Sequence, residues 1–423
     1  DVLSNSYAWE SLRRTLKSGR ITIEPIKEFS TGLVINYIKP EGIKLDIKII
    51  MIGSEYYYDM LNYYDEEFRD LFKVRASFDY EMDNSEGNIN KLIGFIKNFS
   101  MKEGNLELEL DAVIKILEYS ERASNNQNKF TAKFSDIQEI LDESNNWAVT
   151  NEFLMINRQC VDKSIEEREF RNNIYEHKID ESMDKNIIMI ETTGKRVVQI
   201  NGLAVLDYGD YSFGKPSKRS VTTCIGEAGI INIEKEAGMS GRIHDKGVQI
   251  LSGYLGQTYA QDFPVAVNCR ICFEQNYGGI DGDSASSTEL YAIISSLAEV
   301  PISQEIAVTG SINQFGEIQP IGGVTYKVEG FFDICKKRGL TGSQGVIIPF
   351  QNIEELVLKD EVIENVKNGL FHIYAVKHVN EGLKILTGIE AGEKNEKGKF
   401  DMESINGMVY KKLKRYYKAS IKN

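Results

Sequence analysis

The stretch between Gly282 and Pro301 constrains the fold more than any other, because it combines a turn, a helix and a helix stop. Apolar residues recur through it at helical spacing, and the proline ends the run. These apolar residues are Leu290, Ile293, Ile294 and Leu297. Ser286 and Glu289 have the spacing of an S-x-x-E capping box, which predicts that the helix begins at Ser286. Ser284 is therefore expected in the turn just before the helix.

Ser284 is a candidate nucleophile. Free backbone N–H groups and the helix dipole at such a position could stabilise an oxyanion. A serine hydroxyl is a poor nucleophile by itself, so the chemistry requires a base. A serine before a helix is more often a cap or a turn residue, and the G-D-S-A-S signature only half-matches the G-x-S-x-G elbow of hydrolases. The serine has to be judged together with a partner.

Lys327 is the candidate base, at the edge of the apolar stripe of a second helix. Burial there would lower its pKa by desolvation, and a shift from ~10.4 to about 7 costs roughly 4–5 kcal/mol that the fold must supply. The simpler alternative is a solvated lysine in the first turns of a helix. Residues 306–310 and a turn at 313–316 predict a hairpin that would hold Thr309 near the two helices, where its hydroxyl could orient the lysine amine. The joint occurrence of the three residues favours a catalytic group.

Together these motifs resemble the Lon proteases, and more closely their B-type, archaeal-like branch. The matching segments occur in the same order and cover nearly all of residues 186–390; they are 202–205, 210–214, 239–247, 273–275, 281–287, 307–310 and 320–327. The resemblance implies that Ser284 is the nucleophile, Lys327 the general base and Thr309 a hydrogen-bonding support for Lys327. Many Lon proteases have proline before the nucleophile, whereas Asp283 looks like the B-type variant. Asp283 either pairs with Lys327 in a resting state or is a turn residue.

The resemblance also implies a multidomain α/β (α+β) fold. Residues 1–85 look like the C-terminal remnant of an AAA+ α/β core, 86–185 like the helical AAA+ lid, 186–390 like a Lon proteolytic domain and 391–423 like a linker and a C-terminal helix. A length of 423 residues agrees with about three domains. In the first part we expect a helix starting near Tyr7 and a buried strand over 45–53. A first residue of Asp1 rather than Met fits a fragment of a longer chain.

Nucleotide binding is not expected of this chain in the usual way, because no G-x-x-x-x-G-K-[ST] occurs in it. The resemblance implies ATP and Mg²⁺ only for the intact protein, and no cofactor or metal for the peptidase chemistry. It makes Arg69 a candidate trans-acting arginine and Lys133 a candidate nucleotide sensor. A solvated surface charge explains each of them equally well.

Composition limits the classes of function that remain. A net charge of −13 argues against broad nucleic-acid binding. The C-terminal segment is basic and could touch an acidic partner, although a solvated terminal helix is the preferred interpretation; its cations are Lys411, Lys412, Lys414, Arg415, Lys418 and Lys422. Five scattered cysteines suit a reducing compartment. Cys269 and Cys272 should face opposite sides of a strand and share no metal, and His244 is expected to be structural or substrate-side support.

The expected function is that of a Lon-type serine endopeptidase, with a Ser-Lys dyad that hydrolyses unfolded or damaged proteins. The resemblance implies ATP dependence in the intact chain and a homohexameric ring. No apolar run approaches membrane-spanning length, so a cytoplasmic protein without a membrane partner is expected. Two alternatives stay open. One is an inactive protease-like chaperone or binding module, and the other is an ATP-independent Lon-like peptidase.

Overall fold

The computed structural model describes residues 2–22, 40–209 and 211–421. Asp1, Asp210 and Lys422, which entered the predictions above, lie outside the described residues. The chain divides into two compact units, Asp1–Asp79 and Tyr80–Asn423, and each is treated by itself. Many helices and a seven-stranded mixed sheet are present, which confirms the predicted α/β class.

The first unit is a small group of helices with one two-stranded ribbon. Its elements are α1 (Ser6–Ser18), β1 (Arg20–Ile21), β2 (Ile43–Lys44), α2 (Glu55–Tyr64) and α3 (Phe68–Leu71). The helix expected near Tyr7 is confirmed, and the Asn5 side chain caps it by accepting from the Tyr7 and Ala8 N–H groups. Trp9 Nε1 donates to Asp65 Oδ2 over 2.8 Å and ties α1 to the α2–α3 connection.

The buried strand predicted over 45–53 is wrong. Strand β2 ends at Lys44, none of the residues 45–53 is in a strand, and Ile50 and Ile52 are 85% and 97% exposed. A buried strand needs hydrogen-bonded neighbours on its edges, and in the described part of this unit β2 pairs with β1 alone. The apolar run therefore lies outside any strand, and most of its residues are exposed.

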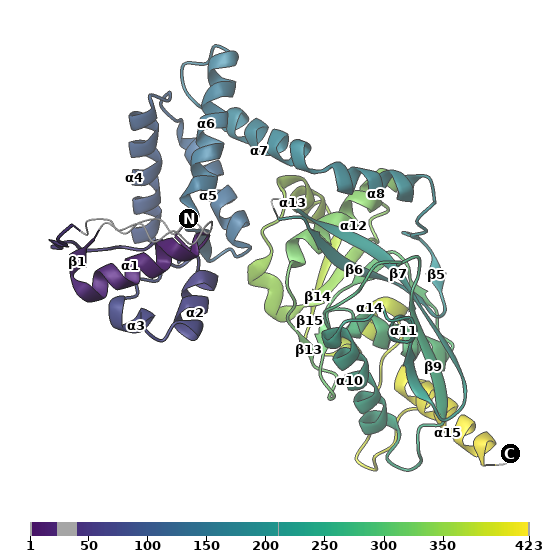
Figure 1. The fold of residues 1–423 in the computed structure, drawn as a ribbon. Coiled ribbons are helices and arrows are strands. Elements are labelled where there is room, and N and C mark those ends of the chain that lie inside the picture. Colours follow the sequence, from purple (N-terminus) through teal and green to yellow (C-terminus); the bar gives the residue numbers. More distant parts are fainter. Residues whose placement is uncertain (1, 23–39, 210, 422–423) are drawn as a thin grey trace. The chain divides into compact units, whose positions relative to one another are not determined.

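The second unit begins with a helical lid. It is made of α4 (Glu86–Glu103), α5 (Leu110–Ser124), α6 (Phe134–Thr150) and α7 (Arg158–Asn172), with the ribbon β3 (Glu81–Asp83) and β4 (Lys129–Thr131). These elements share one apolar cluster, which includes Leu92, Ile116, Ile140 and Val161. Helix α8 (Ile174–Asp184) then leads into the sheet domain (Figure 1).

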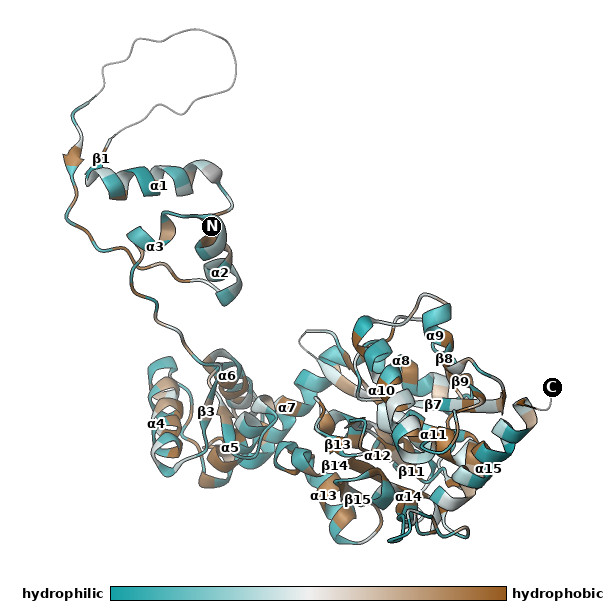
Figure 2. Ribbon diagram, turned by 90° about the horizontal axis from the view of Figure 1, so that it is seen from below, coloured by the Kyte–Doolittle hydropathy of each residue, from teal (hydrophilic) through white to brown (hydrophobic). Residues whose placement is uncertain are grey.

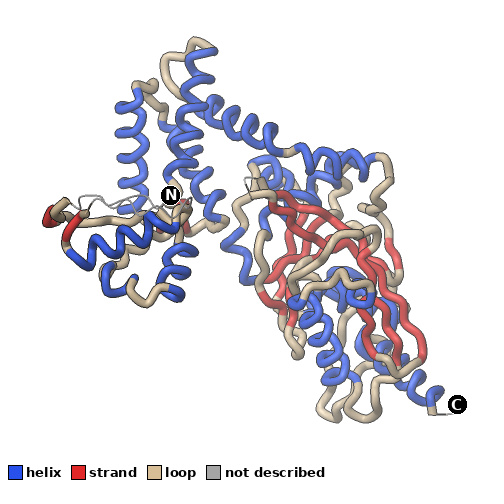
Figure 3. The backbone as a smooth tube through the Cα atoms, viewed as in Figure 1, coloured by secondary structure: helices blue, strands red, loops and turns tan. Residues whose placement is uncertain are grey.

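The main sheet has the strand order β15-β14-β11-β6-β7-β9-β8. These strands are β6 (Gln199–Asp207), β7 (Ser212–Ile225), β8 (Gly229–Asn232), β9 (Val267–Phe273), β11 (Ile306–Val308), β14 (Gly345–Pro349) and β15 (His372–Val376). Strands β15, β14, β11 and β6 run parallel, and β7 is antiparallel to both β6 and β9. Figure 3 shows these strands as the red centre of the domain.

Helices cover both faces of the sheet. They include α9 (Ile233–Glu236), α10 (Arg242–Tyr259), α11 (Ser286–Ala298), α12 (Val324–Arg338), α13 (Asp360–Lys367) and α14 (Val379–Thr387). Val308 joins the apolar cluster of α11, whereas its neighbour Ala307 joins the cluster of α12. Because successive strand residues point to opposite faces, α11 and α12 lie on opposite faces of β11.

Short elements connect these layers. They are β5 (Lys195–Arg196), β10 (Ile302–Ser303), β12 (Ser311–Ile312), β13 (Ile318–Gln319) and the 3-10 helix η1 (Phe350–Glu355). Strands β12 and β13 form the hairpin that the turn at 313–316 predicts. This hairpin joins the end of β11 to the start of α12, the helix that carries Lys327.

The C-terminal helix α15 (Ile405–Ser420) corrects the prediction of a solvated terminal helix. Ile405, Val409 and Leu413 are buried in the same cluster as α11. Lys411 and Lys414 lie on the exposed face, and Figure 2 shows the resulting mixture of hydrophilic and hydrophobic residues along the helix. The helical period therefore gives α15 one packed face and one basic face.

Candidate active site

The turn that carries Ser284 is fixed to the end of β11 by backbone hydrogen bonds. Gly310 N donates to Ser284 O over 3.0 Å, and Ser287 N donates to Gly310 O over 3.1 Å. Gly310 has φ of 150°, a conformation that favours glycine. Thr288 Oγ1 adds a bond of 3.0 Å to Val308 O. The serine turn and the segment that contains Thr309 are therefore held in one register.

The helix begins at Ser286 as predicted, but the predicted capping box is wrong. Ser286 Oγ donates to Asp283 O over 2.8 Å and accepts from Ile312 N over 3.1 Å. Glu289 turns into the interior, where its Oε1 lies 2.8 Å from His244 Nε2. Glu289 is fully buried, so its carboxylate makes its contact in the interior and does not cap the helix.

Lys327 is 3% exposed, in the first turn of α12. Burial and, to a smaller extent, repulsion from Arg219 lower its pKa to about 8, and attraction to Asp283 opposes both effects. The backbone here packs directly on β7, since a Cβ on Gly214 would lie 1.9 Å from Tyr326 O and 3.0 Å from Lys327 Cα. The structure thus places Lys327 within electrostatic reach of Asp283, the neighbour of Ser284.

Thr309 and Asp283 are the two residues that the resemblance assigns to the support of the dyad. Thr309 is 1% exposed, its N–H donates to Ile347 O, and its Oγ1 has no hydrogen-bond partner among the described residues. Asp283 Oδ2 accepts from Ser311 Oγ over 2.9 Å. Within the described residues no ion pair shorter than 4.0 Å joins Asp283 to Lys327. Asp283 is therefore held by the β12 hairpin and acts on Lys327 only at longer range.

The sequence did not predict the burial of Arg219 or the pairing of His244 with Glu289. Arg219 lies in a polar stretch of β7 that reads as an exposed strand, yet it is 2% exposed. His244 Nδ1 lies 3.2 Å from Asn232 Nδ2, which can donate to it, so the neutral ring can donate from Nε2 to Glu289. This agrees with the structural role expected for His244. The one feature of the sequence that goes with the burial of Arg219 is Gly202 on the neighbouring strand, because a side chain at position 202 would occupy the place of the guanidinium.

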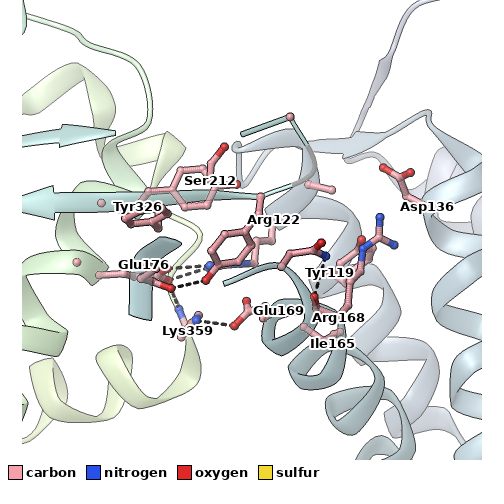
Figure 4. A pocket seen from close by; sticks show the side chains of 18 of the residues that line it. Tyr119, Arg122, Asp136, Ile165, Arg168, Glu169, Glu176, Ser212, Tyr326 and Lys359 are labelled. Carbon is pink, nitrogen blue, oxygen red and sulfur yellow. Dashed lines mark hydrogen bonds and ion pairs between the residues drawn. The ribbon is translucent and has the colours of Figure 1, made fainter. Parts of the chain in front are cut away.

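A second polar site lies between the lid and α12. A pocket of about 310 Å³ is lined by residues of both parts, including Tyr119, Arg122, Lys133, Tyr326, Glu329 and Asp333. Figure 4 shows it, with Lys359 reaching Glu169 across its floor. Lys133, the candidate sensor, lines this pocket. Arg69, the other nucleotide-linked candidate, is exposed in the first unit and donates from Nε to Asn62 Oδ1.

Two of the cysteines lie on one strand of the central sheet, and the structure confirms that they face opposite sides of this strand. Cys269 and Cys272 lie on β9 with alternating burial, on opposite faces of the sheet. In the ranges that the structure covers, no group of three or more His, Cys, Asp or Glu side chains could hold a metal ion. Nor does any described helix have the length and apolar character needed to cross a membrane.

The fold and the site define a mixed α/β domain with a serine turn and a buried lysine at the end of its central strands, attached to a helical lid. Three family models match this chain. They are "LonB-like, AAA domain" over residues 1–79, "Archaeal LonB, AAA+ ATPase LID domain" over 107–171 and "Lon protease (S16) C-terminal proteolytic domain" over 266–388. The chain belongs to the Lon protease family, in its B-type branch.

Curated relatives agree with this placement. A putative Lon protease homolog of Haemophilus influenzae is 33% identical over 324 residues, which is 76% of this chain and 53% of that protein. A putative Lon protease homolog of Escherichia coli is 41% identical over 53% of this chain and 39% of its own length. The archaeal Lon protease of Halobacterium salinarum is 25% identical over 89% of this chain and 51% of its own length. The chain thus spans about half, or less, of these relatives.

Proposed function

We propose that this chain is the peptidase-bearing part of a Lon-type serine endopeptidase in which Ser284 and Lys327 form the catalytic dyad. The observation that carries the proposal is the burial of Lys327, whose pKa falls to about 8 beside the Ser284 turn. A lysine with such a pKa has a substantial neutral fraction near physiological pH and can accept a proton. A solvated lysine could not do so.

The reaction assigned to the dyad is acyl transfer. Lys327 Nζ takes the proton of Ser284 Oγ as this oxygen bonds to the scissile carbonyl carbon, and the C–N bond then breaks as the leaving amine receives that proton. In the second half of the reaction Lys327 Nζ takes a proton from water as the water oxygen bonds to the acyl carbon. The ester C–O bond then breaks, Lys327 gives the proton to Ser284 Oγ, and the carboxylic acid product leaves. Thr309 Oγ1, buried without a partner, supports the orientation of Lys327.

The oxyanion donors can be narrowed to two backbone groups. The Ser286 N–H donates to Asp283 O and the Ser287 N–H to Gly310 O, so both are already engaged. Among the described residues, neither Ser284 N nor Ala285 N has an acceptor. Both precede the helix N-terminus, where the dipole favours negative charge. We assign the tetrahedral oxyanion to these two N–H groups.

The wider role follows from the family. The proposed substrates are unfolded or damaged proteins, the proposed assembly is a homohexamer, and the proposed compartment is the cytoplasm, without a membrane partner or broad nucleic-acid binding. The peptidase chemistry uses no cofactor in this proposal. ATP and Mg²⁺ belong to the intact protein, and because the P-loop sequence is absent from this chain, no step here is assigned to nucleotide.

Covalent labelling tests the proposal. A fluorophosphonate probe should modify Ser284 in the parent chain, as identified by mass spectrometry, and should modify neither Ser284→Ala nor Lys327→Met. Ser286→Ala is a matched control, because Ser286 lies in the same motif but engages in backbone hydrogen bonds. An unlabelled parent that still binds unfolded protein would instead favour the inactive chaperone-like module. Labelling and proteolysis by the purified chain without ATP would favour the ATP-independent peptidase.

A further inference from the structure

Asn352 lies in η1, and the proposed mechanism gives it no role. Its side chain is fully buried, with 0% exposure. Its Oδ1 accepts from Ile321 N over 3.0 Å, and its Nδ2 donates to Ile321 O over 2.8 Å. The same nitrogen also donates to Glu355 Oε2 over 2.7 Å. One side chain thus binds both backbone groups of Ile321.

These contacts require an amide at position 352. An asparagine side chain offers an acceptor and donors side by side, which matches the N–H and the C=O of a single residue. Aspartate would place a carboxylate oxygen against Ile321 O, and leucine would remove this partner from both backbone groups. Because polar groups without partners are costly in the interior, the site favours asparagine. Asn352 therefore holds Ile321 as a neighbouring strand would.

The turn that Asn352 holds leads directly into helix α12. It consists of residues 321–323, and α12 follows at once. Gly323 has φ of 68°, which favours glycine, and a Cβ there would lie 2.7 Å from Val205 Cγ2 on β6. Lys327 N donates to Gly323 O over 3.2 Å and closes the first turn of the helix. The backbone position of Lys327 therefore depends on how this glycine turn is fixed.

The residues that follow Asn352 hold the first turn of α12 as well. Thr325 is 1% exposed. Its Oγ1 donates to Glu355 O over 2.8 Å and accepts from Val357 N over 3.1 Å. The two sets of contacts fall on either side of the glycine turn, both before Lys327 in the chain. The segment that carries Asn352 thus grips the start of α12 at two points.

This segment is itself anchored in two other parts of the fold. It follows directly after β14, which is paired in parallel with both β11 and β15. On the lid side, Gln127 donates from its backbone N to Glu354 O over 2.8 Å and from Nε2 to Leu356 O over 2.7 Å. Asn352 therefore has anchors of its own in the sheet and in the lid.

We propose that Asn352 is a positioning residue for the dyad: by holding both backbone groups of Ile321, it fixes the glycine turn and so the place of Lys327. The inference rests on the proposed function, since a catalytic lysine needs a defined position and a structural one does not. It goes beyond the dyad in giving a part in the reaction to a residue outside the motifs from which the dyad was predicted. A displacement of about 1 Å at a reacting group can lower a rate about 100-fold.

The rate of Ser284 acylation tests the inference in Asn352→Leu, a variant that keeps the size of the side chain and removes its hydrogen bonds. At a fixed concentration of a fluorophosphonate probe, the first-order rate constant of labelling should fall by about 10–100-fold, because Lys327 is no longer held in place. The fraction of chains that finally become labelled should stay the same. A merely structural role would lower that fraction and leave the rate constant unchanged, and this result would overturn the inference.

Gln344→Met is the matched control. Gln344 is a second amide with 0% exposure, at the opposite end of β14. It also accepts a backbone N–H, from Thr341 over 2.8 Å, and donates to a backbone carbonyl, that of Thr192, over 3.2 Å. Its loss should lower the stability of the chain and leave the rate constant of acylation unchanged. Equal falls of the rate constant in Gln344→Met and Asn352→Leu would assign no special role to Asn352.

Hydrogen exchange measures the hold on the turn itself. The Ile321 N–H should exchange faster in Asn352→Leu than in the parent chain, and unchanged exchange would overturn the inference. If Asn352→Leu does not fold, Asn352→Asp carries the acylation test, since it keeps the acceptor for Ile321 N and lacks the donor. An unlabelled Ser284 in the parent, with Ile321 exchange that still responds to Asn352→Leu, would overturn the proposed function and, with it, the catalytic part of this role.

Discussion

Arg122 of the lid and Glu329 of α12 form a two-bond ion pair in which both nitrogen–oxygen distances are 2.7 Å. Arg122 Nη1 also donates to Val357 O over 2.9 Å, and Glu329 accepts the Lys359 N–H over 2.9 Å. Glu329 is 5% exposed and lies on the same helix as Lys327. The lid is therefore bonded directly to the helix that carries the proposed base.

This ion pair should be important for the stability of the second unit. Glu329→Gln leaves Arg122, which is 20% exposed, without its counter-ion. Breaking a fully buried pair costs about 3–5 kcal/mol, so the loss for this partly exposed pair should be about 3 kcal/mol or less. The free energy of unfolding, measured by urea denaturation, should fall accordingly. A double-mutant cycle with Arg122→Met should show strong coupling between the two residues.

Arg168 provides the matched control on the same lid. It pairs with Glu139 at 2.9 Å, but Glu139 is 61% exposed. Exposed pairs contribute about 0–1 kcal/mol, so Arg168→Met should change stability little. Equal losses in Arg168→Met and Arg122→Met would mean that the Arg122 pair has no special role.

The close contact between α12 and β7 leads to a second prediction. A Cβ at Gly214 would lie 1.9 Å from Tyr326 O, so Gly214→Ala must push the start of α12 away from the sheet. Overpacking of this kind costs about 1–3 kcal/mol, and the displacement of Lys327 should reduce labelling of Ser284 as well. Gly256→Ala is the control, because its Cβ would meet open space on α10 and should stabilise the helix by up to about 1 kcal/mol. A Gly214→Ala variant with parental labelling would argue against the close packing described here.

The hydroxyl of Thr309 gives a third prediction. Thr309→Val keeps the shape of the side chain and removes a buried Oγ1 that has no partner, so stability should be nearly unchanged or slightly higher. If this hydroxyl orients Lys327, the rate of peptide hydrolysis should fall by about 10–100-fold, the equivalent of one hydrogen bond to a charged group. Thr288→Val should lower stability and leave the rate of hydrolysis nearly unchanged, since Thr288 Oγ1 donates to Val308 O. Unchanged hydrolysis by Thr309→Val would remove Thr309 from the mechanism.

Asp333, in the pocket between the lid and α12, should make stability depend on pH. Burial and, to a smaller extent, the nearby carboxylates of Glu329, Glu176 and Asp180 raise its pKa to about 6, although Lys359 opposes this rise. A carboxyl with a raised pKa in the folded state stabilises the fold when protonated, and this contribution is lost as pH rises through about 6. Asp333→Asn should therefore stabilise the chain by on the order of 2 kcal/mol at pH 7.5. The gain should shrink when thermal unfolding is repeated at pH 5, and a gain that does not change with pH would contradict this account.

Local patterns predicted the elements of the site better than its interactions. The apolar period and Pro301 predicted the body and the end of α11, and the turn at 313–316 predicted the hairpin that follows β11. The start of α11 at Ser286 was predicted from a capping box that does not form. The capping box failed because Glu289 finds a stronger partner in buried His244, which comes from a distant part of the sequence. A spacing rule cannot report such a contact, since tertiary burial decides which partner a carboxylate takes.

Two further errors have the same origin. The run 45–53 has the composition of a buried strand, but composition does not supply the neighbouring strands that would bury it. Arg219 was overlooked because an arginine in a polar strand normally faces water, and only the absence of a Cβ at Gly202 makes room for it inside. The role expected for Lys327 depended on burial, and that was predictable because its own helix carries a continuous apolar stripe.

The measurement that tests the dyad most directly is the pH dependence of Ser284 acylation in the parent chain between pH 6 and 10. Lys327 must be neutral to accept the serine proton, and its folded pKa of about 8 lies below that of free lysine. The rate of acylation should therefore rise with pH to a plateau, with a midpoint near 8, and Lys327→Met should abolish this step. A rate that is independent of pH over this range, or that is retained in Lys327→Met, would show that Lys327 is not the base.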